Sequence, residues 1–294
     1  GFSVRVSPSW RPDRAVKIEK PDFADYIRQL GTAAGVTIDR FDRLLEALEN
    51  RLDFFEKMGC CASDHGLEGI PCREAGPEEL EQIFQKALRG ESVTPEEKEA
   101  YQFAVLRFLG KEYARRGWVM QIHYSAMRNP NSRLFARLGA DTGFDCIDVD
   151  SAAGKLAGLL DSLDRDNCLP KTVLYSLNPA DNAMLGALIG SFQGPEARGK
   201  IQHGSAWWFN DTKTGMEAQL TNLANLSILG NFIGMLTDSR SLLSYARHEY
   251  FRRILCNLVG TWAENGEIAW DEAFLGGLVQ DICYRNAAAY FGLE

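Results

Sequence analysis

An acidic residue and an arginine stand two positions apart after an apolar run. The run is Phe232 to Leu236, Asp238 and Arg240 follow it, and a polar, aromatic-rich helical segment comes next. A carboxylate supplies a hard oxygen to a cation and can move a proton, and a guanidinium offers a charged fork of donors to an anion. A buried strand that ends in these groups is typical of an active-site rim. The alternatives are a helix cap for Asp238 and a surface ion pair for Arg240.

The same pattern recurs along the chain. In α/β barrels the strand interior is packed, and the chemistry lies where strands end and the following loops begin. Six short apolar runs here precede polar or aromatic residues: Ser3 to Pro8, Cys60 to Ala62, Val119 to Ile122, Thr172 to Leu177, Lys200 to Ile201, and Phe232 to Leu236. We expect six βα units with parallel strands and a ligand site at their carboxyl ends.

The composition fits an enzyme and disfavours several other classes of protein. The 294 residues are 45% hydrophobic and carry a net charge of -8, which argues against a nucleic-acid partner because phosphate binding needs a basic face. No apolar run approaches the roughly 18 residues of a membrane span, and the first residues lack a signal-peptide pattern. We expect a cytoplasmic protein with no membrane partner. Seven irregularly spaced cysteines without a C-x-x-C pair indicate reduced, mostly buried thiols.

Helical segments fill the long gaps between the early strands. Apolar residues at helical spacing follow Thr37, which we expect to act as an N-cap. Further helices are expected from Pro77 to Leu88 and from Pro95 to Arg116, the latter opened by Thr94 ahead of a proline and two acids. After Thr172 the strands are about 30 residues apart, as in a plain βαβ unit. We therefore expect one barrel domain over residues 1–294, with a helical insertion around residues 37–117.

Several long blocks of sequence carry a family resemblance. They are Gln121 to Asp145, Leu169 to Asn182, Gly199 to Met216 and Gly234 to Gly260, with shorter blocks from Ser7 to Asp13 and from Gly59 to Leu67. These blocks closely resemble uronate isomerase, also called glucuronate isomerase, and the resemblance covers essentially the whole chain. It implies a distorted (β/α)8 TIM-type barrel of the amidohydrolase superfamily. It also implies an enzyme of carbohydrate metabolism that interconverts D-glucuronate with D-fructuronate and D-galacturonate with D-tagaturonate.

The chain departs from the family pattern in one respect. The family's metal site begins with a His-x-His pair after the first strand, whereas the four histidines here are never two residues apart. Six strands are expected where the family has eight. The simplest interpretation is that the chain lacks the N-terminal part of the enzyme. Because a six-stranded piece would have open sheet edges, we expect an accompanying N-terminal segment or rearranged packing rather than a closed eight-stranded barrel.

The resemblance implies roles at a divalent-metal site, with zinc the expected ion. Asp238 resembles the carboxylate that ends the last strand and ligates or neighbours the metal. His123 follows a strand whose counterpart in the superfamily carries a metal-site histidine, so it would ligate the metal or donate a hydrogen bond to the substrate. A structural histidine is the alternative. The metal site is expected to be incomplete, because the His-x-His partners are absent from this chain.

Arginines and one tryptophan are expected at the substrate. Arg240 resembles the family's active-site arginine and would hold the substrate carboxylate or a developing enediolate. Arg11 resembles a substrate-binding arginine, and its alternative is an ion pair with Asp13. Trp207, rather than its neighbour Trp208, would stack on the sugar and exclude water, although tryptophan pairs are more often part of a core.

The remaining histidines are less informative. His65 is a further substrate-binding candidate, with a structural pair formed with Asp64 as the alternative. His203 and His248 are expected to be structural.

The implied reaction is aldose–ketose isomerisation of the open-chain sugar through a cis-enediol, with a base, an acid and stabilisation of charge on oxygen. No nucleotide cofactor is expected, because the dinucleotide-binding and P-loop fingerprints do not occur. Two alternatives remain. One is a metal-dependent hydrolase of the same superfamily, which the lack of a histidine between Tyr175 and Asn178 disfavours; the other is a non-catalytic, uronate-binding remnant. The resemblance also implies a homo-oligomer.

Overall fold

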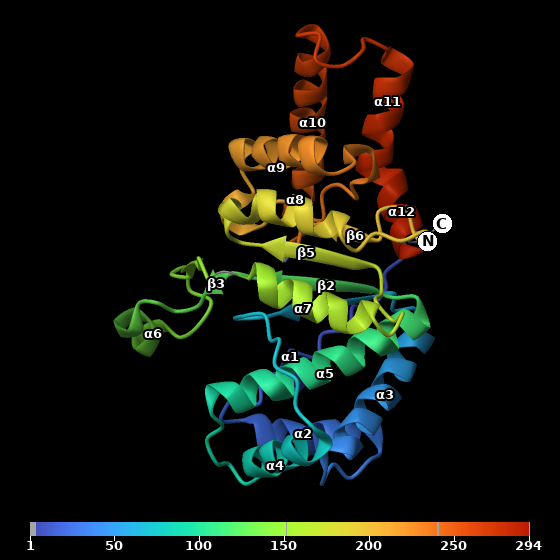
Figure 1. The fold of residues 1–294 in the computed structure, drawn as a ribbon. Helices are drawn as coiled ribbons and strands as arrows, with labels where there is room; N and C mark the ends of the chain where they lie inside the picture. Colours follow the sequence, from blue (N-terminus) through green and yellow to red (C-terminus); the bar gives the residue numbers. More distant parts are fainter. Residues whose placement is uncertain (1–3, 151, 240, 294) are drawn as a thin grey trace. The chain divides into compact units, whose positions relative to one another are not determined.

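Strands and helices alternate along the chain in this computed structural model, which describes residues 4–150, 152–239 and 241–293 (Figure 1). Four strands form one sheet in the order β1-β2-β5-β6. The chain divides into two compact units, which are described separately below. Unit 1 comprises Gly1–Gln121 and Gly154–Lys171, and unit 2 comprises Ile122–Ala153 and Thr172–Glu294. None of the described helices is both long and apolar enough to cross a membrane.

Unit 1 is mainly helical. Its helices are α1 (Asp13–Val16), α2 (Phe23–Ala34), α3 (Phe41–Lys57), α4 (Pro77–Leu88), α5 (Pro95–Arg116) and nearly all of α7 (Ala153–Asp164). Buried aromatic rings hold several of them together: Phe23 stands edge-on to Phe84 and Tyr101, and the latter two rings are stacked. The Tyr101 hydroxyl donates to the carbonyl of Ala15 at 2.8 Å, which satisfies a polar group in this core.

The start of α5 is confirmed and the start of α3 is corrected. At α5 the Glu97 N–H donates to Thr94 Oγ1 (3.2 Å) and the Thr94 N–H donates to the Glu97 carboxylate (2.7 Å), a complete capping box. At α3 the helix begins only at Phe41, and its N-cap is Arg40, with no side-chain cap. The prediction that Thr37 caps this helix was therefore wrong.

The first two predicted strands differ from the observed structure. β1 is Ala62–Gly66, so Asp64 and His65 lie inside the strand rather than after it. Among residues 4–8 there is no strand; the chain instead meets β1 at Trp10, in a parallel bridge with Ser63. The Trp10 N–H donates to the Ala62 carbonyl (3.0 Å), and the Trp10 carbonyl accepts from the Asp64 N–H (2.8 Å).

Unit 2 contains the later strands and their helices. β2 (Val119–Tyr124) enters it at Ile122 and is followed by β5 (Thr172–Ser176) and β6 (Ile201–His203). β5 and β6 pair in parallel, with Thr172 opposite Ile201 and Leu174 opposite His203. All five β5 residues are buried, and none of them is charged, as is usual for a strand covered on both faces. The predicted runs at 119–122, 172–177 and 200–201 are therefore confirmed as strands, with ends shifted by one or two residues.

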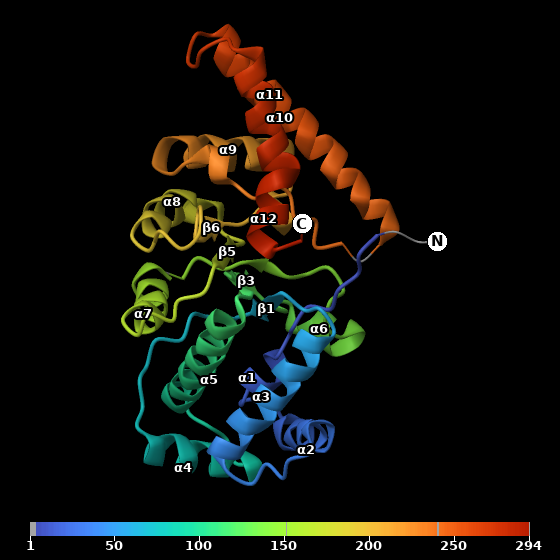
Figure 2. The ribbon, with the colours of Figure 1, turned by 90° about the vertical axis from the view of Figure 1, so that its right-hand side faces the viewer.

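Helices cover this part of the sheet in successive layers. α8 (Asn182–Gly190) packs on β6, α9 (Lys213–Leu226) packs on α8, and α10 (Ala246–Glu264) packs on α9 (Figures 1 and 2). α11 (Glu272–Gln280) lies beside α10 and continues through a π-helical turn (Asp281–Arg285) into α12 (Asn286–Phe291). Short 3-10 helices occur at Pro179–Asp181 (η1), Trp208–Asn210 (η2), Leu229–Asn231 (η3) and Leu242–Tyr245 (η4).

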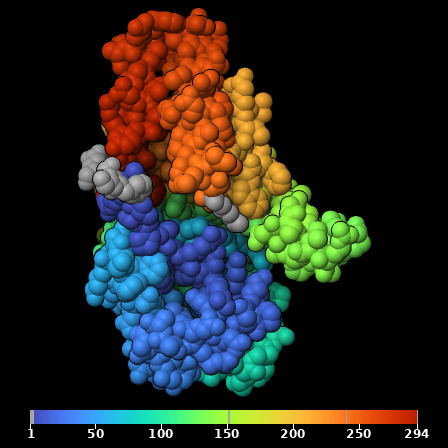
Figure 3. Space-filling view, turned by 180° about the vertical axis from the view of Figure 1, so that it is seen from behind, coloured from blue at the N-terminus to red at the C-terminus, as the bar shows by residue number. Residues whose placement is uncertain are grey.

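A small hairpin of unit 2 was not foreseen. β3 (Ala126–Met127) pairs antiparallel with β4 (Cys146–Ile147), and α6 (Ser132–Leu138) lies in the connection. The connection forms a lobe that protrudes from the surface of unit 2 (Figure 3).

The last predicted strand, Phe232 to Leu236, is not a strand. Gly234 has φ 73°, and a Cβ there would lie 2.1 Å from the Ile282 carbonyl oxygen, so the backbone turns where a strand would stay extended. Side chains supply the partners that a ladder would otherwise supply. The Gln202 amide donates to the Asn231 carbonyl (2.9 Å), and the Asn286 amide donates to the carbonyls of Gly230 (2.8 Å) and Phe232 (2.9 Å). The segment is therefore ordered without belonging to the sheet.

Candidate active site

Three aromatic side chains meet at the carboxyl ends of neighbouring strands in unit 2. The His123 ring, near the end of β2, stacks on Tyr175 of β5, with ring centroids 4.2 Å apart and planes 4° from parallel. Trp207, four residues after β6, stands edge-on to His123 with centroids 4.8 Å apart. His123 is half-buried between them. Its imidazole is therefore fixed in orientation by two rings and retains access to the surface.

A glycine makes the His123–Tyr175 stack possible. Gly204 directly follows β6, and a Cβ at this position would lie 2.1 Å from Tyr175 Cε1. Only a residue without a side chain lets the tyrosine ring lie against this backbone. Gly204 is itself held on both sides, because its N–H donates to the Leu174 carbonyl at 2.8 Å and its carbonyl accepts from the Gln219 amide.

Asp238 joins this group through Trp207. The Trp207 indole N–H donates to Asp238 Oδ2 at 3.3 Å, and the Asp238 carboxylate is otherwise exposed. The backbone at Asp238 has φ 43°, in the left-handed region that few non-glycine residues adopt. Upstream, the Ser205 hydroxyl donates to the Leu236 carbonyl (3.1 Å) and accepts from the Leu236 N–H (3.4 Å). The structure thus brings together three sequence-predicted residues, His123, Trp207 and Asp238.

Trp208 takes a different position from Trp207. Its ring is tilted against Trp207 with centroids 4.9 Å apart, and the Arg128 guanidinium lies over the Trp208 ring, 4.7 Å from the ring centroid. Arg128 also pairs with Asp145 at 2.7 Å, which anchors it within the β3–β4 hairpin. Sequence reasoning missed Arg128 and Tyr175. Tyr175 could have been found from the strand alternation of β5, whereas no local signal marks Arg128.

A buried polar network lies below the ends of β2 and β5. The Ser176 hydroxyl donates to Asp181 Oδ2 (2.5 Å), and the Asn178 amide donates to Asp181 Oδ1 (3.2 Å). Burial, together with the nearby Asp181 charge, raises the pKa of the Tyr124 phenol. The Asn210 amide donates to the Leu177 carbonyl at 3.0 Å, which ties the loop after β6 to the loop after β5. This network ties the loop that carries Trp207 to the loop that follows Tyr175 and the rest of β5.

The two site candidates of unit 1 lie in a different environment. Arg11 forms ion pairs with Asp13 and Asp64, each at 3.3 Å, and its side chain is 56% exposed. His65 is fully buried, with Nε2 3.1 Å from the Tyr113 hydroxyl. Burial raises the pKa of that hydroxyl well above its ordinary value. The Arg11 arrangement includes the ion pair with Asp13 that was stated as its alternative, whereas the contact described for His65 is with Tyr113 and not with the Asp64 of its stated alternative. The substrate-binding roles of both residues stay predictions. Arg240 lies outside the described residues.

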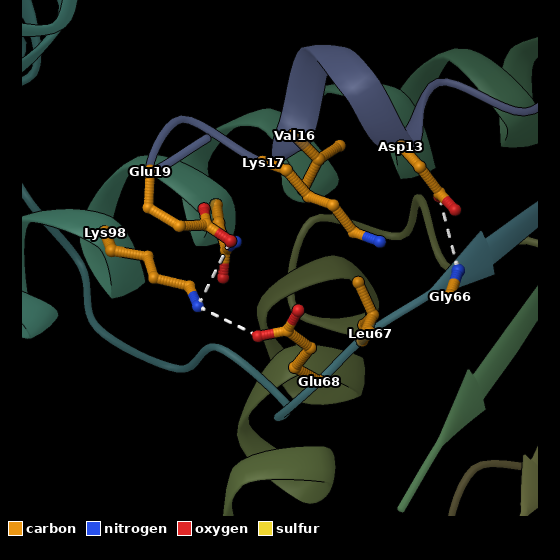
Figure 4. A pocket seen from close by; sticks show the side chains of 9 residues that line it. Asp13, Val16, Lys17, Glu19, Gly66, Leu67, Glu68 and Lys98 are labelled. Atoms are coloured by element: carbon orange, nitrogen blue, oxygen red, sulfur yellow. Dashed lines mark hydrogen bonds and ion pairs between the residues drawn. The ribbon is translucent and has the colours of Figure 1, made fainter. Parts of the chain in front are cut away.

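A small hollow next to Asp13 in unit 1 is filled by paired charges (Figure 4). Lys98 Nζ lies 3.4 Å from Glu19 and 3.6 Å from Glu68. Burial acts to raise the pKa of the Glu68 carboxyl, but the charges of Lys20 and Lys98 outweigh it and the pKa is lowered. Because the acids and lysines compensate one another, this hollow has the character of a structural ion-pair cluster.

The described residues do not by themselves fit a metal ion. Within residues 4–150, 152–239 and 241–293 no three His, Cys, Asp or Glu side chains gather as a ligand set. Asp238 offers one carboxylate, and the donor that meets it is the Trp207 indole N–H. The expected zinc therefore stays a prediction, and no chemical step is derived through it.

Comparison with known proteins gives a consistent result. Residues 1–291 match the family model of glucuronate isomerase. The uronate isomerase of Lachnoclostridium phytofermentans is 54% identical over 99% of this chain and 62% of its own length, and that of Lachnospira eligens is 52% identical over 100% and 63%. The chain thus spans less than two thirds of these relatives.

Solved structures agree with the sequence comparison. The crystal structure of uronate isomerase from Thermotoga maritima matches with a TM-score of 0.90 and 33% identity, over 97% of this chain and 61% of that one. Glucuronate isomerase from Caulobacter crescentus matches with a TM-score of 0.88 and 26% identity, over 98% and 59%. The predicted α/β fold of distorted-barrel type is confirmed. This chain belongs to the glucuronate isomerase family, also called the uronate isomerase family.

Proposed function

We propose that this chain contributes catalytic residues to an enzyme that isomerises hexuronates. The reactions are D-glucuronate to D-fructuronate and D-galacturonate to D-tagaturonate. Family membership supports the reaction, and the observation that carries the assignment to a site is the group formed by His123, Trp207 and Asp238. The Asp238 carboxylate and the His123 imidazole both contact Trp207. His123 lies near the carboxyl end of the parallel strand β2, and strand ends are where α/β barrels place their chemistry.

The reaction needs a proton moved between C2 and C1 and stabilisation of the charge that develops on oxygen. In our proposal Asp238 moves the proton, because its carboxylate is exposed to solvent while one oxygen is held by the Trp207 N–H. His123, held between Tyr175 and Trp207, donates a hydrogen bond to a substrate oxygen. Trp207 excludes water from one side of the sugar. From the sequence resemblance, Arg240 would hold the substrate carboxylate.

Proton NMR in D₂O tests the proposal, because isomerisation through an enediol changes the sugar spectrum. D-glucuronate is incubated with the purified chain, alone and mixed with the segment of the Lachnoclostridium phytofermentans enzyme that the chain does not span, with added zinc. We expect ketose to form, and we expect Asp238→Asn to slow its formation by at least about 100-fold, the scale of general acid–base catalysis.

Asp25→Asn is the matched control, because Asp25 is an exposed acid on α2 that pairs with Arg28 of the same helix in a surface contact. Its rate should equal that of the unchanged chain. Undiminished conversion by Asp238→Asn would remove Asp238 from the mechanism. An absence of ketose in both the chain and the mixture would contradict the isomerase assignment.

The cytoplasmic location and the homo-oligomer also stay predictions. Light scattering on the purified chain measures the oligomer directly.

A further inference from the structure

One arginine links the two segments that carry Trp207 and Asp238. Arg247 is the second residue of α10. Its Nη1 donates to the Thr237 carbonyl at 2.7 Å, and its Nε lies 3.2 Å from Asp211 Oδ2. Thr237 directly precedes Asp238, and Asp211 directly follows the short 3-10 helix that comes after Trp207. A single guanidinium therefore contacts the segment that follows Trp207 and the residue that precedes Asp238.

Asp211 is itself fully engaged. Its side chain is 9% exposed, and its second oxygen accepts from the Tyr250 hydroxyl, one turn further along α10. Burial, followed by the hydrogen bond to Asp211 and the charge of that residue, raises the pKa of Tyr250. Both Asp211 oxygens thus have partners from α10. A carboxylate removed from water in this way needs such partners, since an unpaired buried charge is strongly destabilising.

The Thr237 carbonyl belongs to the peptide plane that precedes Asp238. The angle φ of Asp238 is the rotation about its N–Cα bond, relative to this peptide plane. A hydrogen bond that holds the Thr237 carbonyl therefore holds one side of that torsion. The value of 43° is costly for a residue other than glycine and persists only where the surroundings hold it. No strand ladder does so here, because residues 232–236 lie outside the sheet. Ser205 holds the segment at Leu236, and Arg247 holds it one residue later.

We propose that Arg247, Asp211 and Tyr250 form a positioning cluster that sets the Asp238 carboxylate against the Trp207 indole. This inference rests on the proposed function of Asp238. The cluster touches the loop of Trp207 and the backbone of the Asp238 segment and does not itself meet the reacting atoms. A charged helix face that looks like solvated surface in the sequence thereby acts on the geometry of the site.

The first test is spectroscopic and needs no activity. In a proton–nitrogen correlation spectrum, the Trp207 indole N–H peak is identified as the one lost in Trp207→Phe. We expect Arg247→Met to move this peak in the same direction as Asp238→Asn does. Arg253→Met is the matched control, because Arg253 lies on the same helix, is 78% exposed and pairs with Glu249 of that helix. It should leave the peak in place.

Two conservative variants weaken the contacts of the positioning cluster only in part. Arg247→Lys keeps the charge but lacks the fork, so its ammonium reaches Thr237 or Asp211 and an intermediate shift is expected. Asp211→Asn keeps an acceptor for Tyr250 and weakens the ion pair, so it should shift the peak in the same direction. If Arg247→Met fails to fold, as judged by circular dichroism, these two variants decide the question.

The second test is kinetic. We expect Arg247→Met to lower kcat by about 10- to 100-fold and to leave KM within about twofold. Misplacing a catalytic group by about an ångström slows the reaction without weakening substrate binding. An unmoved indole peak and an unchanged kcat in folded Arg247→Met would overturn the positioning cluster. If the indole peak moves in Arg247→Met but Asp238→Asn keeps full activity, the positioning cluster stands and the proposed role of Asp238 is refuted.

Discussion

Replacing Gly204 with alanine should separate His123 from its stacking partner. The new Cβ would lie 2.1 to 2.5 Å from three atoms of the Tyr175 ring, and ordinary contact begins near 3.4 Å. The ring must therefore retreat by about 1.3 Å. Tyr175 is only 4% exposed, and His123 is stacked on it at 4.2 Å, so the displacement passes to the histidine. Overpacking of this kind costs about 1–3 kcal/mol of folding free energy.

Urea unfolding followed by circular dichroism measures that cost, and the shift of the His123 ring protons in NMR reports the lost stack. Gly276→Ala provides the matched control, since Gly276 lies in α11 and a Cβ there meets nothing within 4 Å. We expect that control to be stabilised by about 0.5–1 kcal/mol, the usual gain from removing a helical glycine. Equal stability of Gly204→Ala and the unchanged chain, with unshifted His123 protons, would refute the reasoning.

Three further predictions follow from other parts of the structure. Burial lowers the pKa of His203 from the ordinary value of 6.5 to about 4. The free energy of unfolding should therefore fall as the pH drops from 6.5 towards 4, because the unfolded chain binds the proton first. His203→Gln should reduce this fall by up to roughly 3 kcal/mol in urea-unfolding measurements. Thr94→Ala removes the capping box of α5 and should cost about 1 kcal/mol in the same assay, whereas Ser92→Ala, at an exposed position in the preceding loop, should change it little. Trp207→Phe keeps a ring beside His123 but loses the donor to Asp238, so initial rates of glucuronate conversion should fall by about threefold to tenfold, and an unaltered rate would show that this hydrogen bond is dispensable.

Local signals in the sequence located several elements correctly. The four residues from Thr94 to Glu97 contain all the signals that predict the N-terminus of α5, namely an N-cap threonine, a proline and two acids. The structure shows the predicted cap. The apolar run of β5 was recognisable because every residue of that strand is buried. The rule that polar groups follow strands also selected His123 and Trp207, which proved to be neighbours.

Features that depend on distant contacts could not be predicted in this way. The run from Phe232 to Leu236 reads as a strand, and its bend at Gly234 depends on a carbonyl nearly fifty residues later, at Ile282. Arg247 sits among charges that are typical of a solvated helix face, and no local pattern marks Asp211 and the Thr237 carbonyl as its partners. Composition and periodicity describe one segment at a time, whereas these arrangements need two or three.

The irregular segment before Asp238 has a consequence for mutational tolerance. A strand in a ladder keeps its partners under almost any substitution, because main-chain groups are common to all residues except proline. The segment before Asp238 is instead attached through the side chains of Gln202, Ser205, Arg247 and Asn286. The placement of this segment thus depends on four side chains, and each of them can be replaced by mutation. Random mutagenesis should therefore find loss-of-function changes at these residues, which lie outside the proposed group of His123, Trp207 and Asp238. The same four positions offer a route for retuning the chain by directed evolution without altering Asp238 itself.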